Sequence, residues 1–285
     1  MIVNMQLARD RKISPEGETT DPFETAQEKL FPAWRNRKLE DAADALSENR
    51  ADIAQPIVQR YLEKHPDDPA ALHLMADIAR RADQFEEAER LLLICIENDP
   101  DCPGYRFNYA VIVRTLGKYE EALAALDVLL KNDARNPLFR DQKARVLSHM
   151  ERFTEALTYR RDLAEEYPQI ATVWVAYGNL LRHLGKQEEA IITYHKANEY
   201  AGDSIAAYTR LAETYRFSEA ETARMQAQLV LPDLSKEERA NLCFALGTAY
   251  GDQKRYAESF DSYAKANALL RAGVDFDPDG LTAPG

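Results

Sequence analysis

Arginine recurs in this sequence at one fixed interval, and its spacing could serve the recognition of carboxylates. Arg80, Arg114, Arg182 and Arg216 are separated by one common interval or by twice that interval, and Ser148 occupies the intermediate site. A guanidinium group offers fixed bidentate geometry to a carboxylate. Asparagine side chains near this row could hold the backbone of a peptide through their amide groups. The arginine row therefore indicates binding rather than catalysis.

The residue types that usually catalyse reactions or bind metals do not form such a site in the sequence. His149 and His183 share one register, which places them about 10 Å apart on neighbouring helices. Ligand atoms must lie about 2 Å from a zinc ion, so these histidines are too far apart to share one metal. Paired glutamates such as Glu86 and Glu87 stand where helices begin, as the helix dipole favours. We therefore expect no catalytic residue, no metal site and no cofactor.

A repeat of about 34 residues organises these side chains. Position 20 of the repeat is alanine in the first five units, and position 8 is alanine or glycine from the second unit onward. Small residues at both positions let two antiparallel helices pack closely. Prolines at 66, 100 and 168 fall at position 32. The units span 35–68, 69–102, 103–136, 137–170 and 171–204, followed by an irregular unit near 205–239 and a last unit at 240–273.

This pattern resembles the tetratricopeptide (TPR) repeat over about residues 35–272. The resemblance implies an all-α fold, a right-handed superhelical solenoid of antiparallel helix hairpins. First helices would line a concave groove and second helices would face outward. Gly117 and Gly185 at position 15 suit the turn between the two helices, where a positive φ is needed. An irregular helical bundle, which is the alternative, requires no fixed register of this kind.

The groove of such a solenoid is the expected binding site, because positions 2, 5, 9 and 12 share one face of each first helix. We expect it to bind an extended segment of a partner protein that carries acidic residues. Alternatively, the arginines complement the helix dipole and pair with glutamates of the next unit. The clamp that binds chaperone tails is disfavoured, because His73 and Asp77 replace its Lys and Asn. The predicted groove residues are Arg80, Arg114, Arg182, Arg216, Asn108, Asn179, His73, Gln142 and Arg145.

The two ends of the chain differ from the repeats. Residues 1–22 are polar and predict a disordered segment, whereas residues 23–272 are assigned to the solenoid. Residues 273–285 predict a flexible tail or a truncated linker. Between the first segment and the first repeat, the sequence DPFETAQEKLFPAW predicts a capping helix that shields the first repeat.

The sixth and seventh units resemble the segment that joins the repeats to the catalytic domain in bacterial TPR-containing sulfotransferase family proteins. That resemblance implies a following strand and a glycine-containing loop for the phosphosulfate donor, and this chain has no such loop. We therefore expect a non-catalytic protein-interaction module. The alternative is the substrate-recruiting N-terminal half of a sulfotransferase. The matching stretches are Arg216-Phe217-Ser218, Met225, Pro232-Asp233-Leu234, Phe244-Ala245-Leu246-Gly247, Tyr256-Ala257-Glu258-Ser259-Phe260 and Ala266-Asn267.

The net charge and the cysteine content limit the classes of partner and the cellular compartment that we expect. The chain carries 36 Lys and Arg against 48 Asp and Glu, a net charge of −12 that disfavours nucleic acid and anionic membranes as partners. Cys95, Cys102 and Cys243 form no C-x-x-C pair, which fits a reducing compartment. The longest apolar run, 91–96, is too short to span a bilayer. We expect a cytoplasmic bacterial protein of undetermined oligomeric state.

Overall fold

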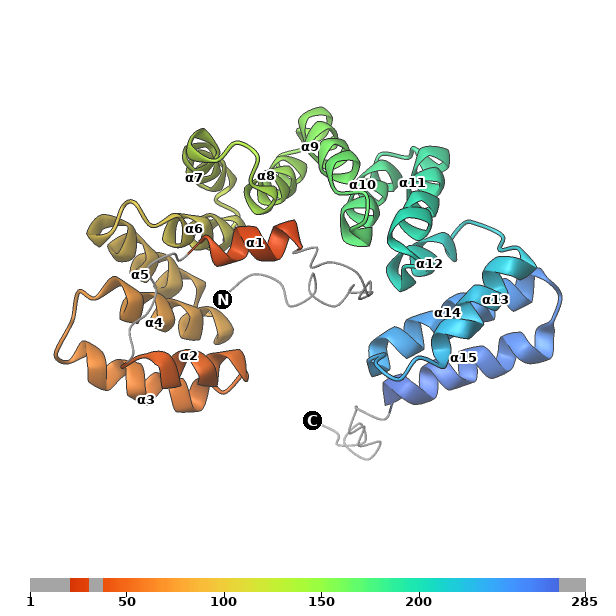
Figure 1. Cartoon of the computed structure of the whole chain (residues 1–285), viewed down its shortest axis with the longest axis horizontal. Helices are drawn as coiled ribbons and strands as arrows, with labels where there is room; N and C mark the ends of the chain where they lie inside the picture. Colours follow the sequence, from red (N-terminus) through yellow and green to blue (C-terminus); the bar gives the residue numbers. More distant parts are fainter. Residues whose placement is uncertain (1–20, 31–37, 272–285) are drawn as a thin grey trace, which may run out of the picture. The chain divides into compact units, whose positions relative to one another are not determined.

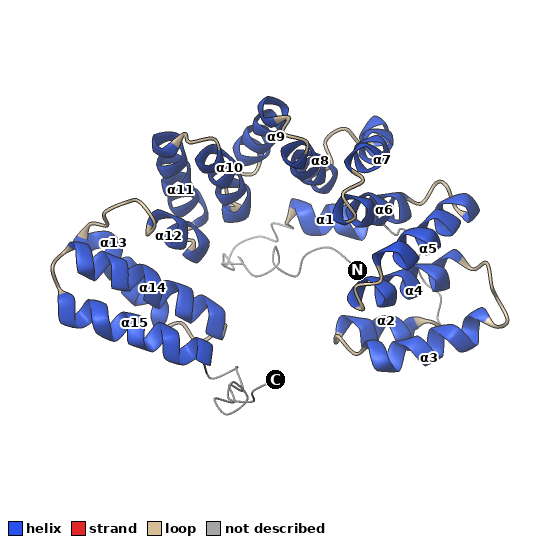
Figure 2. Cartoon of the chain, turned by 180° about the vertical axis from the view of Figure 1, so that it is seen from behind, coloured by secondary structure: helices blue, strands red, loops and turns tan. Residues whose placement is uncertain are grey.

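The computed structural model describes residues 21–30 and 38–271. Every regular element in those residues is an α-helix (Figure 2), which confirms the all-α prediction. The helices of the described residues are α1 (Pro22–Glu28), α2 (Glu40–Ser47), α3 (Ala51–Leu62), α4 (Pro69–Arg81), α5 (Phe85–Asn98), α6 (Pro103–Thr115), α7 (Tyr119–Asn132), α8 (Pro137–His149), α9 (Phe153–Glu166), α10 (Ala171–His183), α11 (Gln187–Ala201), α12 (Ile205–Leu211), α13 (Glu219–Leu229), α14 (Lys236–Asp252) and α15 (Tyr256–Arg271).

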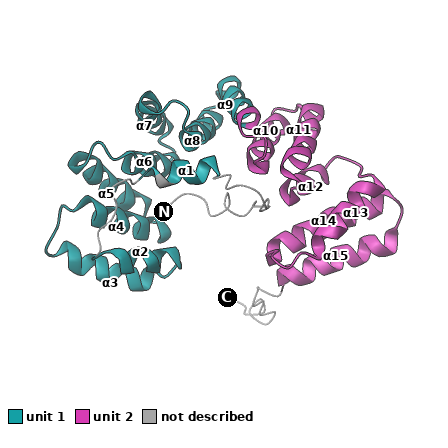
Figure 3. Ribbon diagram, viewed as in Figure 1, with its two compact units in different colours: residues 1–163 teal, residues 164–285 magenta. Residues whose placement is uncertain are grey.

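The chain divides into two compact units, residues 1–163 and residues 164–285 (Figure 3). In unit 1, α4 packs against α5 and α6 packs against α7, while α5 also contacts α6 and α7 contacts α8. In unit 2, α10 packs against α11 and α14 packs against α15. Figure 1 shows α4, α6 and α8 on one side of unit 1 and α5 and α7 on the other. We call the side of α4, α6 and α8 that is turned away from α5 and α7 the inner face of unit 1.

Alanine at position 20 of the repeat is fully buried within its hairpin. The side chain of this alanine is 0 % exposed in all five repeats that carry it. A longer side chain at this position would push the two helices apart or force its neighbours out of their preferred rotamers. The repeat of small residues therefore determines how tightly each hairpin closes. These alanines are Ala54, Ala88, Ala122, Ala156 and Ala190.

The residue at position 8 of the first helix is smallest where the residue at position 24 of the second helix is an aromatic one. A Cβ added to Gly178 would lie 2.4 Å from Cε1 of Tyr194, and one added to Gly247 would lie 2.9 Å from the ring of Tyr263. The regular repeats with alanine at position 8 carry valine, leucine or arginine at position 24 instead of tyrosine. Glycine is therefore required where an aromatic ring from the second helix lies on the backbone of the first.

The residue at position 15 has a left-handed backbone conformation in all six regular repeats. Gly117 and Gly185 have φ values of 78° and 73°, which confirms their predicted role. The turn is closed by the next residue, as when the Lys118 amide donates to the Val113 carbonyl at 2.8 Å. Residues with a Cβ adopt this conformation at a cost of about 1–2 kcal/mol. Helix packing must therefore hold the four turns without glycine, which are centred on Asn49, Asp83, Glu151 and Lys254.

The irregular unit near 205–239 begins with a short first helix. α12 has seven residues and ends at Leu211, whereas α4, α6, α8 and α10 have thirteen each. Ser218 and Glu221 form a capping box that starts α13, and Ser235 and Glu238 form another that starts α14. Because the second box starts the helix at Lys236, α14 begins four residues before the predicted unit at 240.

A helix does form in the segment expected to cap the first repeat, but it contacts α8 instead of the first repeat, so the capping expectation was wrong. Residues 31–34 of that segment lie outside the described residues. α1 contacts α8 on the inner face of unit 1 (Figure 1). The carbonyl of Leu30 then accepts hydrogen bonds from the Gly104 amide at 3.0 Å and from Cys102 Sγ at 3.6 Å, both at the start of α6. Phe23, Ala26 and Leu30 are 3, 5 and 3 % exposed, so this docking buries their apolar surface. Apart from residues 21 and 22, the predicted disordered segment 1–22 lies outside the described residues, as does the predicted tail 273–285.

Substituting Gly178→Ala tests the size relation between the residues at positions 8 and 24. We expect a loss of about 1–3 kcal/mol in unfolding free energy, because the new methyl group overlaps the buried ring of Tyr194. Gly251→Ala is the matched control, since its Cβ would meet only Ser259 Oγ at 3.4 Å and alanine favours a helix. Urea unfolding followed by circular dichroism measures both. Equal stability of the two variants would contradict the proposed size relation.

Candidate functional site

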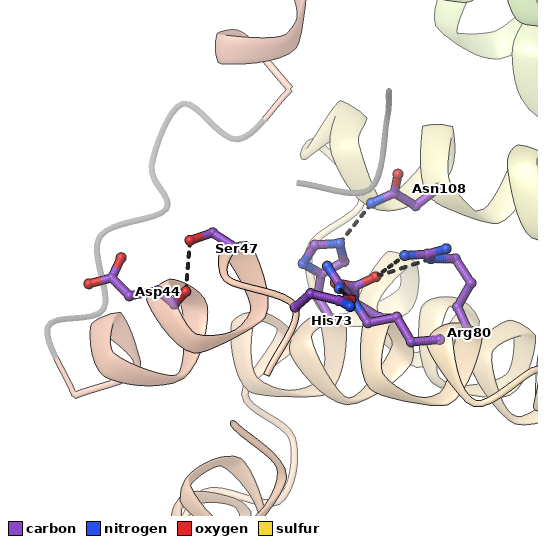
Figure 4. Close-up of polar contacts among 8 residues, drawn as sticks. Asp44, Ser47, His73, Arg80 and Asn108 are labelled. Atoms are coloured by element: carbon purple, nitrogen blue, oxygen red, sulfur yellow. Dashed lines mark hydrogen bonds and ion pairs between the residues drawn. The ribbon is translucent and has the colours of Figure 1, made fainter. Parts of the chain in front are cut away.

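A buried polar contact joins α4 and α6 at the inner face of unit 1. His73 Nε2 lies 2.7 Å from Asn108 Nδ2, and both side chains are buried (Figure 4). Because Nδ2 can only donate, His73 accepts at Nε2 as a neutral imidazole. Burial lowers the pKa of His73 from 6.5 to about 3. His73 is therefore a neutral acceptor in the folded protein at neutral pH rather than a cationic groove residue.

Arg80 is already engaged by an acid on its own helix. Its Nη2 lies 2.7 Å from Oδ1 of Asp77, and Arg81 Nε approaches the other carboxylate oxygen at 3.0 Å (Figure 4). The carboxylate of Asp77 is almost fully buried between these two guanidinium groups. At Arg80, the acid that pairs with the arginine is an aspartate of the same helix, not a glutamate of the next unit as the alternative interpretation expected.

A second ion-pair cluster lies on α8 and α9. Arg145 Nε donates to Asp141 Oδ2 at 2.7 Å, and Arg160 donates to the other oxygen of the same carboxylate. Burial alone would raise the pKa of Asp141, but the two guanidinium groups outweigh it and hold this pKa below its ordinary value. Asp141 is therefore ionised, and both of its carboxylate oxygens are occupied by arginine.

Arg114 on α6 has a different environment from Arg80 and Arg145. Its pKa is lowered, chiefly by burial and then by the positive charge of Arg145. Its Nε is buried and has no hydrogen-bond partner among the described residues. The carboxylate of Asp141 acts on this pKa in the opposite direction, but burial and the charge of Arg145 outweigh it, so an added carboxylate would stabilise the cation.

Two amide side chains on the inner face also have unmet hydrogen-bonding capacity. Asn108 Oδ1 and Gln142 Oε1 are buried, and neither has a hydrogen-bond partner in the part of the chain that the structure describes. Asn108 and Gln142 occupy the same position of two consecutive repeats, on α6 and α8. Buried polar atoms are normally satisfied, and the exceptions commonly indicate a site for a water molecule or a ligand. Together with Arg114, these atoms form a row that could take backbone amides and a carboxylate.

The predicted groove residues of unit 2 are largely paired within that unit. Asn179 Oδ1 accepts a hydrogen bond from the Tyr194 hydroxyl at 2.9 Å, and Arg182 Nη1 lies 2.5 Å from Oε2 of Glu213. Arg182 thus pairs with a glutamate of the following repeat, as the alternative interpretation expected. Arg216 does not belong to a helix: α12 ends at Leu211, and Arg216 is exposed in the segment before α13. Its assignment to the arginine row of the first helices is therefore corrected.

The structure brings six of the nine predicted residues together in unit 1, on α4, α6 and α8: His73, Arg80, Asn108, Arg114, Gln142 and Arg145. Two features of this face were not predicted from the sequence. Asp77 and Asp141 neutralise several of its arginines, and α1 covers part of it. The carboxylates occur three or four residues before an arginine on the same helix, a signal that could have revealed the pairing.

The described residues contain no group of three or more His, Cys, Asp or Glu that could hold a metal ion. They also contain no helix with the length and apolar character needed to cross a membrane. Cys95, Cys102 and Cys243 are free thiols, and burial raises the pKa of each.

Comparison with known proteins identifies the repeat. A family model described as tetratricopeptide repeat matches residues 73–137 and 142–204. This chain contains TPR repeats. The matched residues span α4 to α11, and the helix hairpins of both units follow the TPR arrangement. No curated protein sequence matches the chain.

Solved TPR structures share this fold at low sequence identity. A tetratricopeptide repeat protein from Parabacteroides merdae is 15 % identical, with a TM-score of 0.55 over 90 % of this chain and 96 % of that one. PilW, described as a widely conserved type IV pilus biogenesis factor, is 15 % identical, with a TM-score of 0.54 over 87 % and 96 %. A double mutant of MamA RS-1 is 10 % identical, with a TM-score of 0.51 over 64 % and 95 %. The matched family model and structures lend no support to the sulfotransferase resemblance.

The buried imidazole of His73 predicts a pH dependence of the TPR array. Between pH 6.5 and about 3 the unfolded chain binds a proton at this residue and the folded chain does not. Stability should therefore fall as the pH falls through this window, by up to about 1.4 kcal/mol per pH unit from His73. We expect His73→Gln to lose this part of the dependence, as measured by urea unfolding from pH 7 to pH 4. His149→Gln, at an exposed histidine, is the control, and identical slopes for wild type and His73→Gln would contradict the assignment.

Proposed function

We propose that this TPR array is a non-catalytic protein-interaction module that binds a polypeptide segment of a partner on the inner face of unit 1. The observation that carries the proposal is the row of buried polar atoms without partners among the described residues: Arg114 Nε, Asn108 Oδ1 and Gln142 Oε1. A polypeptide supplies what this row lacks, because its N–H and O–H groups donate and its acidic side chains accept. The TPR repeats support the same role.

The charge of this face favours a partner segment with acidic residues. Arg114 lies close enough to Arg145 for the second cation to lower its pKa. Arg145 already pairs with Asp141, so a partner carboxylate would act on Arg114, whose charge it would compensate through charge-assisted hydrogen bonds. The net charge of −12 gives the whole protein the opposite sign, so the attraction is local to this face. The same net charge disfavours nucleic acid as a competing partner.

The cellular setting and the roles of the other arginines belong to the same proposal. The protein would work in the cytoplasm of a bacterium, without a cofactor of its own. Arg80 and Arg182 are paired with Asp77 and Glu213, so they contribute to a binding surface only where a ligand replaces those acids. Arg114 and Arg182 each have a buried Nε without a hydrogen-bond partner among the described residues. Arg182 also pairs with Glu213, whereas the pKa of Arg114 is lowered by burial and by the charge of Arg145.

Charge reversal at the predicted groove tests the function. A partner captured by the full-length chain is first identified, and its affinity is then measured by calorimetry for Arg114→Glu and for Arg182→Glu. We expect Arg114→Glu to weaken binding by about tenfold or more, because a carboxylate at this site would repel an acidic segment. Arg182→Glu should weaken binding less, since Arg182 already pairs with Glu213.

Arg90→Glu is the matched control for charge reversal. Arg90 is exposed on α5, away from the inner face, and pairs with Glu87 three residues earlier in the way that Arg80 pairs with Asp77. This variant should bind the partner as the wild type does. Unchanged affinity of folded Arg114→Glu for the partner would exclude the proposed binding face.

The sulfotransferase alternative rests on the sequence resemblance of residues 216–267. Several of those residues have structural roles here: Phe217 packs against Tyr208 with ring centroids 6.0 Å apart, Ser218 caps α13, and Met225 is fully buried. Thermal-shift measurement with the phosphosulfate donor tests the alternative. We expect no stabilisation of this chain, because it lacks a phosphate-cradling loop. A clear rise in Tm with donor concentration would favour the sulfotransferase interpretation.

A further inference from the structure

The N-terminal helix α1 already occupies part of the inner face of unit 1. It contacts α8, and the carbonyl of Leu30 accepts hydrogen bonds from Gly104 N and Cys102 Sγ at the start of α6. Figure 1 shows α1 beside α6 and α8, on the side away from α7. α1 is therefore bound where the proposed function places a partner, although it belongs to the same chain.

The contacts of α1 have the spacing of an amphipathic helix in a groove. The buried apolar side chains of α1 and of the turn that follows it are Phe23, Ala26 and Leu30, at i, i+3 and i+7, and the described side chains between them are half-buried or exposed. The Asp21 side chain starts the helix by accepting a hydrogen bond from Phe23 N at 2.8 Å. A helix of seven residues is too short to be stable in isolation, since about 12–15 residues are needed in water. α1 is thus helical because it is docked on the inner face.

Polar complementarity shows that α1 is an imperfect ligand. Its first residues include the acids Asp21 and Glu24. The helix that it contacts, α8, includes Arg140 and Arg145, of which Arg145 already pairs with Asp141. The polar atoms of Asn108, Gln142 and Arg114 named above keep no partner among the described residues while α1 is docked. A longer helix with similar apolar spacing and polar groups that reach this row would bind better, because each buried group it satisfied would lose its desolvation penalty.

We propose that the inner face of unit 1 recognises an amphipathic helix with an aromatic, a small and an aliphatic residue at i, i+3 and i+7 and acidic residues in its first turn, and that α1 is an intramolecular occupant which a partner helix displaces. This inference rests on the proposed function and specifies its partner as a helix rather than an extended segment. Tethering gives α1 a high effective concentration, so α1 also sets the affinity threshold that a partner must exceed.

Binding of α1 in trans tests the helical recognition. The probe is a fluorescent peptide of residues 21–30, DPFETAQEKL, and the protein is the full-length chain with Phe23→Ser and Leu30→Ser, which releases its own α1. Measured by anisotropy, the peptide should bind this double variant about tenfold or more tightly than it binds the wild type, whose α1 competes. A peptide carrying the same two serines should bind neither protein. Equal binding of the unmodified peptide to variant and wild type, or binding to neither, would overturn the proposal.

Cys102 provides a second readout that does not depend on the affinity measurement. Its Sγ contacts the Leu30 carbonyl, and it is only half-buried, whereas Cys95 and Cys243 are buried in the repeats. Release of α1 should make Cys102 react about tenfold or more faster with a thiol reagent, and saturating peptide should restore the slow rate. Labelling of Cys95 and Cys243 reports whether the repeats stay folded. An unchanged Cys102 rate in the double variant would contradict docking of α1.

Phe260→Ser is the matched control, because Phe260 is an exposed aromatic residue on α15 in unit 2. It should leave both peptide binding and Cys102 labelling as in the wild type. The outcomes also separate this inference from the proposed function. Failure of the peptide to bind, together with weakened partner affinity in Arg114→Glu, would exclude the helical ligand and retain the interaction module. Peptide binding with unchanged partner affinity in Arg114→Glu would place the partner elsewhere.

Discussion

The close approach of two helices at positions 8 and 20 is the constraint on which the rest of this structure depends. Alanine at position 20 has no exposed surface in any of the five units that carry it, and Gly178 leaves no room for a methyl group beside Tyr194. Because the same contact recurs from one repeat to the next, each hairpin presents its first helix in the same orientation within a unit. Residues at equal positions, such as Asn108 and Gln142, consequently line up along one face.

That alignment turns ordinary polar residues into a continuous surface. On the inner face of unit 1, acids on the same helices neutralise Arg80 and Arg145, while Arg114 and two amide oxygens are left without partners among the described residues. Apolar contact holds α1 against this surface, but α1 does not satisfy its buried polar atoms. α1 is therefore an internal ligand that leaves polar atoms of this surface unsatisfied, and a ligand that satisfied them would bind more tightly.

Much of the fold could be predicted from the sequence, because small residues, prolines and turn glycines act locally and repeat. The candidate site was harder to predict for the opposite reason. The docking of α1 joins residues 23–30 to residues 102–104 and α8, contacts that carry no periodic signal. Arg216 was misplaced because the repeat register assumed a full-length first helix where α12 has seven residues. The burial of His73 followed from contact with the next unit, which its own helical face does not reveal.

Hydrogen exchange on the full-length chain tests the central claim most directly, namely that a partner binds the inner face of unit 1 in exchange for α1. In the free protein, the amide of Thr25 is bonded to the Asp21 carbonyl and that of Gly104 to the Leu30 carbonyl. When the captured partner is added, we expect amides of α1 to exchange faster while those of α6 and α8 become more protected. Partner binding that leaves the protection of α1 unchanged would contradict this account.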